Sequence, residues 1–203
     1  MVKLLALVIF SYLLGSIPSA YIAGKLKKQI DIRKTGTGNV GATNVLIAIG
    51  PAFGALVYTF DLLKGLIAVL LARNLAGTDI AMGLCGLAAI LGHDLSIFLR
   101  FSGGKGVATT TGVMFGIHSQ IMWLLVFAWF IFTIMTNYFI LASLLCMLFI
   151  PILMYFFKLS NIYMVFGILY FLVGLFTHRE DVVRILSGKE KRAFDSVRKY
   201  FGI

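Results

Sequence analysis

Six long apolar runs dominate the chain and decide which solvent it can fold in. They cover residues 4–23, 51–73, 80–99, 107–135, 137–157 and 161–177. A helix needs roughly 20 apolar residues to cross the hydrocarbon core of a bilayer, which is the length of these runs. With 60% hydrophobic and 13% charged residues, the 203-residue chain also lies outside the composition of soluble domains. The sequence therefore predicts an all-α, polytopic membrane protein.

The number of crossings depends on the run 107–135, which is long for one helix and short for two. Lys and Arg gather in residues 25–34, 100–105 and 179–199, which the positive-inside rule assigns to the cytoplasm. An even number of crossings must then join residues 105 and 179, so the long run should split near residues 116–120. The result is seven transmembrane helices, with the N-terminus outside and the C-terminus cytoplasmic.

The charge and the cysteines add little beyond this topology. The formal charge of +10 follows the predicted cytoplasmic loops, so no nucleic-acid partner is expected. Cys85 and Cys146 lie inside apolar runs, and no Cys/His spacing typical of a metal site occurs, so neither a metal nor a cofactor is expected. We expect one membrane domain over residues 1–203, with cytoplasmic motif segments 25–50, 92–112 and 178–203. Apolar residues at Val182, Ile185, Leu186, Phe194, Val197, Tyr200 and Phe201 predict an amphipathic C-terminal helix.

Three polar, glycine-rich segments interrupt the apolar chain, and function is expected there. The first polar segment covers residues 34–44, the second residues 92–112 and the third residues 178–191. Backbone amides of Gly-rich turns beside Lys, Thr and Asn suit a phosphate. Next to membrane helices, such groups indicate chemistry on a phosphate and a lipid together.

The first polar segment contains GTGNVG, which matches a dinucleotide-binding pattern in letters only, because a membrane helix precedes it. Its glycines still permit close approach of backbone amides to an anion. The candidate binding residues are Gly36, Thr37, Gly38, Asn39, Thr43 and Asn44. The alternative is an ordinary tight loop whose polar residues cap the next helix.

The second polar segment holds Lys105 among Gly103, Gly104 and Gly106, ahead of a predicted helix. A lysine charge flanked by exposed glycine amides predicts a phosphate site, and the alternative is a flexible basic loop.

In the third polar segment, His178 and Asp181 stand three residues apart, so the carboxylate could orient the imidazole. The alternative is a histidine that only packs at the membrane boundary. Asp61 and Lys64 lie inside an apolar run, where they either neutralise one another or let Lys64 line a substrate pocket.

Together these motifs resemble the acyl-phosphate-dependent glycerol-3-phosphate acyltransferase family of bacterial membranes. The resemblance covers nearly the whole chain, through GSIPSAYI at 15–22, GTGNVGATNVL at 36–46, DLLKG at 61–65, GHDLSIFLRFSGGKGVAT at 92–109 and HREDVVRILSGKE at 178–190. It implies transfer of a fatty acyl group from acyl phosphate to the 1-hydroxyl of glycerol 3-phosphate, in the bacterial cytoplasmic membrane and among membrane lipids. The products would be lysophosphatidic acid and inorganic phosphate.

The same resemblance implies a role for each candidate residue. Gly103 to Gly106 would hold the phosphate of acyl phosphate, and the first polar segment would shape the acceptor pocket. His178 would assist proton transfer, oriented by Asp181, and Thr37 and Lys105 would complete the catalytic residues.

Two departures from the family pattern remove a positive charge and add a negative one. Ile47 stands where Arg is usual, and Asp181 stands where Asn is usual. Smaller departures are Thr37 in place of Ser and Leu95-Ser96 in place of Phe-Pro. They leave three alternatives open: a non-catalytic paralogue that binds a phospholipid or phosphometabolite, an acyltransferase with a different phosphorylated acceptor, or a small transporter using Asp61 and Lys64.

Overall fold

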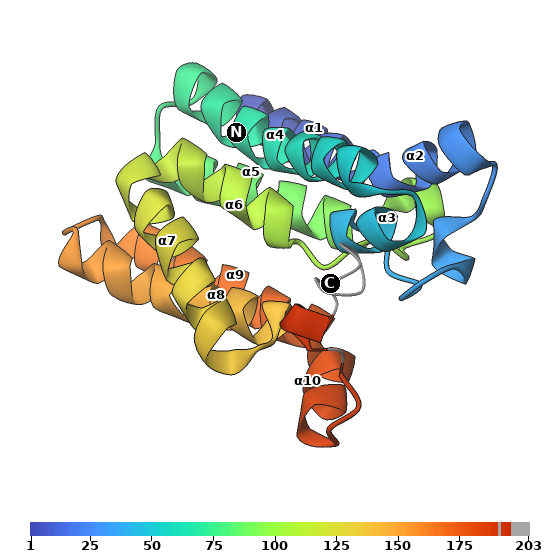
Figure 1. Ribbon diagram of the computed structural model, residues 1–203. Coiled ribbons are helices and arrows are strands. Elements are labelled where there is room, and N and C mark those ends of the chain that lie inside the picture. Colours follow the sequence, from blue (N-terminus) through green and yellow to red (C-terminus); the bar gives the residue numbers. More distant parts are fainter. Residues whose placement is uncertain (191, 196–203) are drawn as a thin grey trace. The chain divides into compact units, whose positions relative to one another are not determined.

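The computed structural model describes residues 1–190 and 192–195, and all the regular elements in that range are helices (Figure 1). The chain divides into two compact units, unit 1 (Met1–His118) and unit 2 (Ser119–Ile203). A single membrane domain over residues 1–203 stays a prediction.

Unit 1 runs from the N-terminus through the first two polar segments. Its elements are α1 (Val2–Ser16), α2 (Ser19–Lys28), the 3-10 turn η1 (Ile32–Lys34), α3 (Ala42–Ala48), α4 (Pro51–Leu75), α5 (Asp79–Asp94), the 3-10 turn η2 (Ile97–Leu99) and α6 (Val107–Ile117). Unit 2 holds the third polar segment. Its elements are α7 (Ser119–Thr136), α8 (Phe139–Phe156), α9 (Asn161–Thr177) and α10 (Arg179–Leu186).

Several helices are long and apolar enough to cross a membrane. Within the described residues there are 5 such spans: Val2–Lys28, Pro51–Leu75, Asp79–Leu99, Ser119–Thr136 and Phe139–Phe156. The bent pair α9 and α10, with an angle of 61° between them, would make up to 6. The prediction of an all-helical protein with several membrane-spanning helices is confirmed. The count of seven and the orientation of the termini stay predictions.

The long apolar run 107–135 splits where its polar interruption predicted. Helix α6 ends at Ile117 and α7 begins at Ser119. Arg73, in the last turn of α4, donates to the backbone carbonyls of Gly116 and, at 3.3 Å, of Ile117. These bonds satisfy carbonyls that the end of α6 leaves without helical partners. With 11 residues, α6 covers only about half of the bilayer core, at roughly 1.5 Å per residue.

Helix α6 packs in parallel against the second half of α4. A Cβ on Gly65 would lie 2.1 Å from the Thr109 carbonyl oxygen, and one on Gly112 would lie 1.8 Å from the Leu62 oxygen. Such close backbone contact requires small residues, as is common between membrane helices. Since the far end of α6 reaches Arg73, the beginning of α6 faces the middle of α4.

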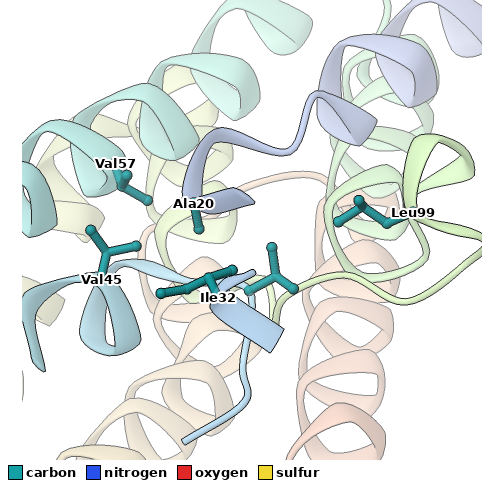
Figure 2. Packing of buried hydrophobic residues seen from close by; sticks show 6 residues of the cluster. Ala20, Ile32, Val45, Val57 and Leu99 are labelled. Atoms are coloured by element: carbon teal, nitrogen blue, oxygen red, sulfur yellow. The ribbon is translucent and has the colours of Figure 1, made fainter. Parts of the chain in front are cut away.

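A small apolar core fixes the first polar segment beside α4 (Figure 2). It draws one buried side chain from each of α2, η1, α3, α4, η2 and the loop before α3, namely Ala20, Ile32, Val40, Val45, Val57 and Leu99. These elements carry short apolar stretches that can be buried only against one another. The loop between η1 and α3 is therefore anchored at both ends.

Unit 2 begins with three consecutive helices joined by short turns, an arrangement typical of antiparallel neighbours. After α10, the backbone amides of Ala193 and Phe194 donate to the main-chain oxygen of Asn137 (2.7 Å) and to its Oδ1 (2.9 Å). The chain beyond α10 thus returns to the turn between α7 and α8. Helix α10 forms the first part of the predicted amphipathic helix and ends at Leu186, so Phe194 follows a break in the helix. The positions Val197, Tyr200 and Phe201 lie outside the described residues.

Candidate functional site

Asn44 organises the first polar segment from within. It is completely buried, and its Nδ2 donates to the carbonyl oxygens of Ile32 (2.9 Å), Thr35 (3.0 Å) and Asn39 (2.9 Å). Its Oδ1 accepts from the Thr37 amide at 2.8 Å. Because both ends of this side-chain amide bind the loop, Asn44 holds the loop in shape. A substrate-binding role for Asn44 stays a prediction.

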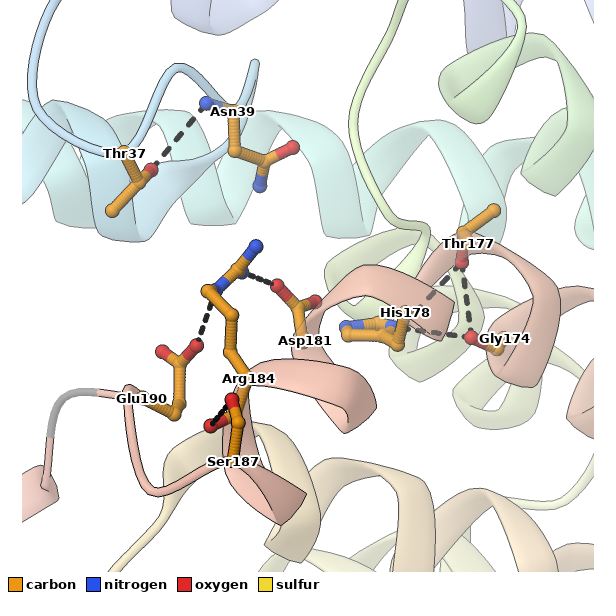
Figure 3. Close-up of polar contacts among 9 residues, drawn as sticks. All are labelled: Thr37, Asn39, Gly174, Thr177, His178, Asp181, Arg184, Ser187 and Glu190. Carbon is orange, nitrogen blue, oxygen red and sulfur yellow. Dashed lines mark hydrogen bonds and ion pairs between the residues drawn. The ribbon is translucent and has the colours of Figure 1, made fainter.

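The other candidates of this segment lie on its surface. Thr37 and Thr43 are exposed, Asn39 is half-buried, and the Asn39 amide donates to Thr37 Oγ1 at 3.4 Å (Figure 3). Gly36 and Gly38 adopt positive φ angles of 60° and 75°, which favour glycine. The glycines thus serve the turn itself, and the hydroxyls of Thr37 and Thr43 are the groups it presents.

The basic side chain of Arg33, just before the first polar segment, is engaged by a neighbouring carboxylate. Arg33 binds Asp31 through two bonds of 3.0 and 2.7 Å. This bond lowers the pKa of Asp31 to about 2, with the Arg33 side chain as the main cause. The guanidinium also lies over the Tyr21 ring. Arg33 therefore stabilises η1.

The glycine loop, residues Gly103 to Gly106, is bound to the end of α5. The Gly103 amide donates to the Asp94 carbonyl and the Gly104 amide to the His93 carbonyl, both at 3.0 Å. A Cβ on Gly104 would lie 2.1 Å from His93 Nε2 and 2.8 Å from the Val40 oxygen. These two glycines thus permit tight packing, and their amides donate hydrogen bonds to α5. The sequence had predicted that the amides face a phosphate.

The anion-binding role predicted for this loop would then rest on Lys105 and on the start of α6. Lys105 is half-buried, and Gly106 caps α6 in a left-handed conformation with φ of 71°. The helix dipole of α6 and the lysine charge both favour an anion here. The close approach of Gly104 to Val40 also brings the first two polar segments together within unit 1.

Lys64 is bound within unit 1 by a carboxylate and a backbone carbonyl. Its Nζ lies 2.6 Å from Asp61 Oδ1 and also donates to the Ile17 carbonyl, and it is 5% exposed. The Ile17 carbonyl lies at the break between α1 and α2 and also accepts from the Ser19 amide at 3.1 Å. The contacts favour the structural alternative for Asp61 and Lys64 over a substrate-binding Lys64.

In unit 2, His178 is the C-terminal cap of α9 and is buried, with 3% of its surface exposed. Its Nδ1 lies 2.9 Å from the Gly174 carbonyl oxygen (Figure 3). A carbonyl oxygen only accepts, so Nδ1 carries the hydrogen, and in the neutral ring Nε2 keeps its lone pair. Such a nitrogen can accept a proton from a hydroxyl.

Asp181 is held by a residue that the sequence reasoning missed. Its carboxylate, completely buried, forms an ion pair with Arg184. Arg184 Nε also binds Glu190 at 2.7 Å (Figure 3). The i,i+3 spacing of Asp181 and Arg184 was the available signal. The extra negative charge at position 181 is thereby paired, and the role of Asp181 in orienting His178 stays a prediction.

Among the described residues, no group of three or more His, Cys, Asp or Glu side chains could hold a metal ion.

Comparisons with known proteins agree along nearly the whole chain. A family model described as glycerol-3-phosphate acyltransferase matches residues 5–188. A glycerol-3-phosphate acyltransferase of Geotalea daltonii is 42% identical over 187 residues, which cover 92% of this chain and 95% of that protein. One of Aquifex aeolicus is 40% identical over 197 residues, covering 94% and 99%.

A solved structure agrees as well. It is the crystal structure of PlsY (YgiH), an integral membrane glycerol 3-phosphate acyltransferase, in its glycerol 3-phosphate form. The TM-score is 0.89 at 37% identity, over 93% of this chain and 94% of that chain. The lysophosphatidic acid form gives a TM-score of 0.88.

Proposed function

Because this chain belongs to the glycerol-3-phosphate acyltransferase family, we propose that it transfers a fatty acyl group from acyl phosphate to the 1-hydroxyl of glycerol 3-phosphate. The chain is an acyltransferase of phospholipid synthesis and an integral membrane protein. The proposal adds the donor and the products, lysophosphatidic acid and inorganic phosphate. One observation carries it: Lys105 lies at the N-terminal end of α6, where a phosphate is favoured.

The proposed reaction needs no covalent intermediate on the protein. Acyl phosphate is a mixed anhydride and already activated, so positioning and charge stabilisation suffice. The 1-oxygen of glycerol 3-phosphate bonds to the acyl carbon while the bond from that carbon to the phosphate oxygen breaks. Phosphate leaves with the bonding electrons, and Lys105 stabilises its charge. His178 Nε2 accepts the proton of the attacking hydroxyl.

The direct test is release of inorganic phosphate by purified protein given acyl phosphate, with and without glycerol 3-phosphate. We expect release to depend on the acceptor and to match lysophosphatidic acid formed. Release without acceptor, or lysophosphatidic acid formed only with another acyl donor, would contradict the proposal.

A different phosphorylated acceptor remains the second candidate, and Ile47 supports it. The side chain is 44% exposed on α3, beside Gly36, where the family pattern has a cation. Other phosphorylated polyols therefore belong in the same assay. A higher kcat/KM for one of them would identify it as the acceptor.

We further propose seven spans, with the N-terminus outside the bacterial cytoplasmic membrane and the C-terminus in the cytoplasm. Five or six helices of spanning length and the short α6 support this count. The bonds from Ala193 and Phe194 to Asn137 also support it, because they require an even number of crossings between these residues. The helices α8 and α9 provide two.

Cysteine labelling tests this topology in a variant with Cys85 and Cys146 replaced by alanine. A cysteine at position 189 should react with a membrane-impermeant maleimide only after permeabilisation. A cysteine at position 159, in the turn between α8 and α9, is the matched control and should react in intact cells. Labelling at 189 in intact cells would refute the proposed orientation.

A further inference from the structure

A cluster of polar side chains is buried in unit 1 among apolar helices. Asp61, Lys64 and His93 are only 1%, 5% and 8% exposed. Asp61 Oδ1 receives hydrogen bonds from Ser19 Oγ at 2.5 Å and Lys64 Nζ at 2.6 Å, and lies 3.6 Å from His93 Nδ1. We call Ser19, Asp61, Lys64 and His93 the buried network.

Such groups are costly inside a membrane protein, so each needs a reason to be there. The reason for Lys64 is its hydrogen bond to the Ile17 carbonyl at the break between α1 and α2. Asp61 then compensates the charge of Lys64. His93 is not needed to bind a carbonyl at this break in the same way, because the carbonyl of neighbouring Ser16 is already bound by Ser96 Oγ at 2.5 Å.

The contacts of His93 lead from Asp61 to the glycine loop. The Nδ1 side of its ring faces Asp61, and the Nε2 side lies against Gly104, where a Cβ would be 2.1 Å away. Its backbone carbonyl accepts from the Gly104 amide at 3.0 Å. The ring is thus enclosed between a fixed carboxylate and the loop residue that precedes Lys105.

We propose that the buried network is a positioning device for the glycine loop, in which Asp61 fixes the His93 ring and the ring fixes Gly104 and hence Lys105. His93 and Asp61 are positioning residues, because they act through Lys105. The inference rests on the proposed function for the role of Lys105, but the loop placement itself is independent of any substrate. It also explains why the loop is glycine-rich, since a side chain at 104 would displace the ring.

Hydrogen exchange of the loop amides tests the placement without substrate. In the purified protein, the Gly103 and Gly104 amides should exchange slowly, because both are bonded to α5. In His93→Gln and in Asp61→Asn, we expect their exchange to accelerate by about tenfold. Ser19→Ala, which removes one bond to Asp61, should give a smaller acceleration and remains informative if Asp61→Asn does not fold.

Arg73→Gln is the matched control. It removes a charged hydrogen-bond donor at the opposite end of α6, so it disturbs the same helix without touching the network. Exchange at Gly103 and Gly104 should stay within about twofold of the parent protein. Equal acceleration in Arg73→Gln and His93→Gln would mean general loosening of unit 1 and would overturn the proposal, as would no acceleration in His93→Gln.

A double-mutant cycle tests the action through Lys105. Alone, His93→Gln should lower kcat/KM for acyl phosphate by about tenfold or more, because small misplacement of a binding group is expensive. Added to Lys105→Ala, it should cost less than about twofold further. Losses that multiply would show that His93 acts independently of Lys105 and overturn the positioning role.

The two arms separate this inference from the proposed function. If the parent protein transfers no acyl group from acyl phosphate, the proposed function fails while the exchange result still decides the loop placement. If acyl transfer is normal and exchange at Gly103 and Gly104 is unchanged in both network variants, the network inference alone fails.

Discussion

Replacing Lys105 with alanine is expected to lower kcat/KM for acyl phosphate by about 100-fold or more, or roughly 2.7 kcal/mol of transition-state stabilisation. The reason is that Lys105 supplies the positive charge beside the N-terminal end of α6, while the amides of Gly103 and Gly104 donate hydrogen bonds to α5. The lysine therefore carries more of the phosphate interaction than the glycine-rich sequence implies. Initial rates of phosphate release at varied acyl phosphate concentration give the measurement.

The control for Lys105→Ala is Lys158→Ala, which removes an exposed lysine from the turn between α8 and α9. We expect its kcat/KM to stay within about twofold of the parent value. Thermal stability in detergent should be similar for both variants. Near-native kcat/KM in Lys105→Ala would remove the lysine from the phosphate site.

The helices could be predicted well from the sequence, because hydropathy records directly which residues lipid can solvate. Apolar residues 161–177 match α9 at both ends, and the run 51–73 falls short of α4 by two residues. The division of the run 107–135 was also predictable from its polar interruption. Hydropathy does not show how two helices are aligned along their length. That α6 begins opposite the middle of α4 follows from the tertiary contact of Gly65 with Thr109.

The polar segments were found, but the roles within them were only partly predictable. Asn44 and Gly104 are residue types common in anion sites. In the structure, however, the side-chain amide of Asn44 and the backbone amide of Gly104 donate to the protein's own backbone carbonyls. Whether a donor faces a ligand or a carbonyl depends on which other segments it meets, and a single sequence does not give this. His93 was passed over for the same reason, because its significance lies in its contacts with Asp61 and Gly104.

The comparisons with known proteins also help to choose among the functions that the sequence left open. Identities of 40% and 42% to glycerol-3-phosphate acyltransferases support an enzyme over a transporter or a non-catalytic paralogue. The structure weakens one argument for loss of activity, because Asp181 is paired with Arg184. Ile47 remains the departure that removes a cation, and acceptor choice is where its effect should appear.

The His178→Ala variant is expected to lower kcat by about 100-fold or more, within the range usual for loss of a general base. The Gly174 carbonyl fixes hydrogen on Nδ1, so Nε2 is the nitrogen able to take the proton of the acceptor hydroxyl. KM for acyl phosphate should change much less than kcat, since this nitrogen acts on the acceptor and not on the donor phosphate. Steady-state kinetics with each substrate varied in turn separate the two parameters.

His118→Ala is the matched control for His178→Ala, because it removes a histidine from the end of α6 farthest from the glycine loop. Its kcat should stay within about twofold of the parent value. If His178→Ala kept near-native kcat, the proton would have to leave by another route, and the donor's own phosphate oxygens would be the nearest base. If instead His178→Ala raised KM for glycerol 3-phosphate and left kcat unchanged, His178 would bind the acceptor rather than accept its proton. The split between kcat and KM therefore assigns the chemistry of this side chain.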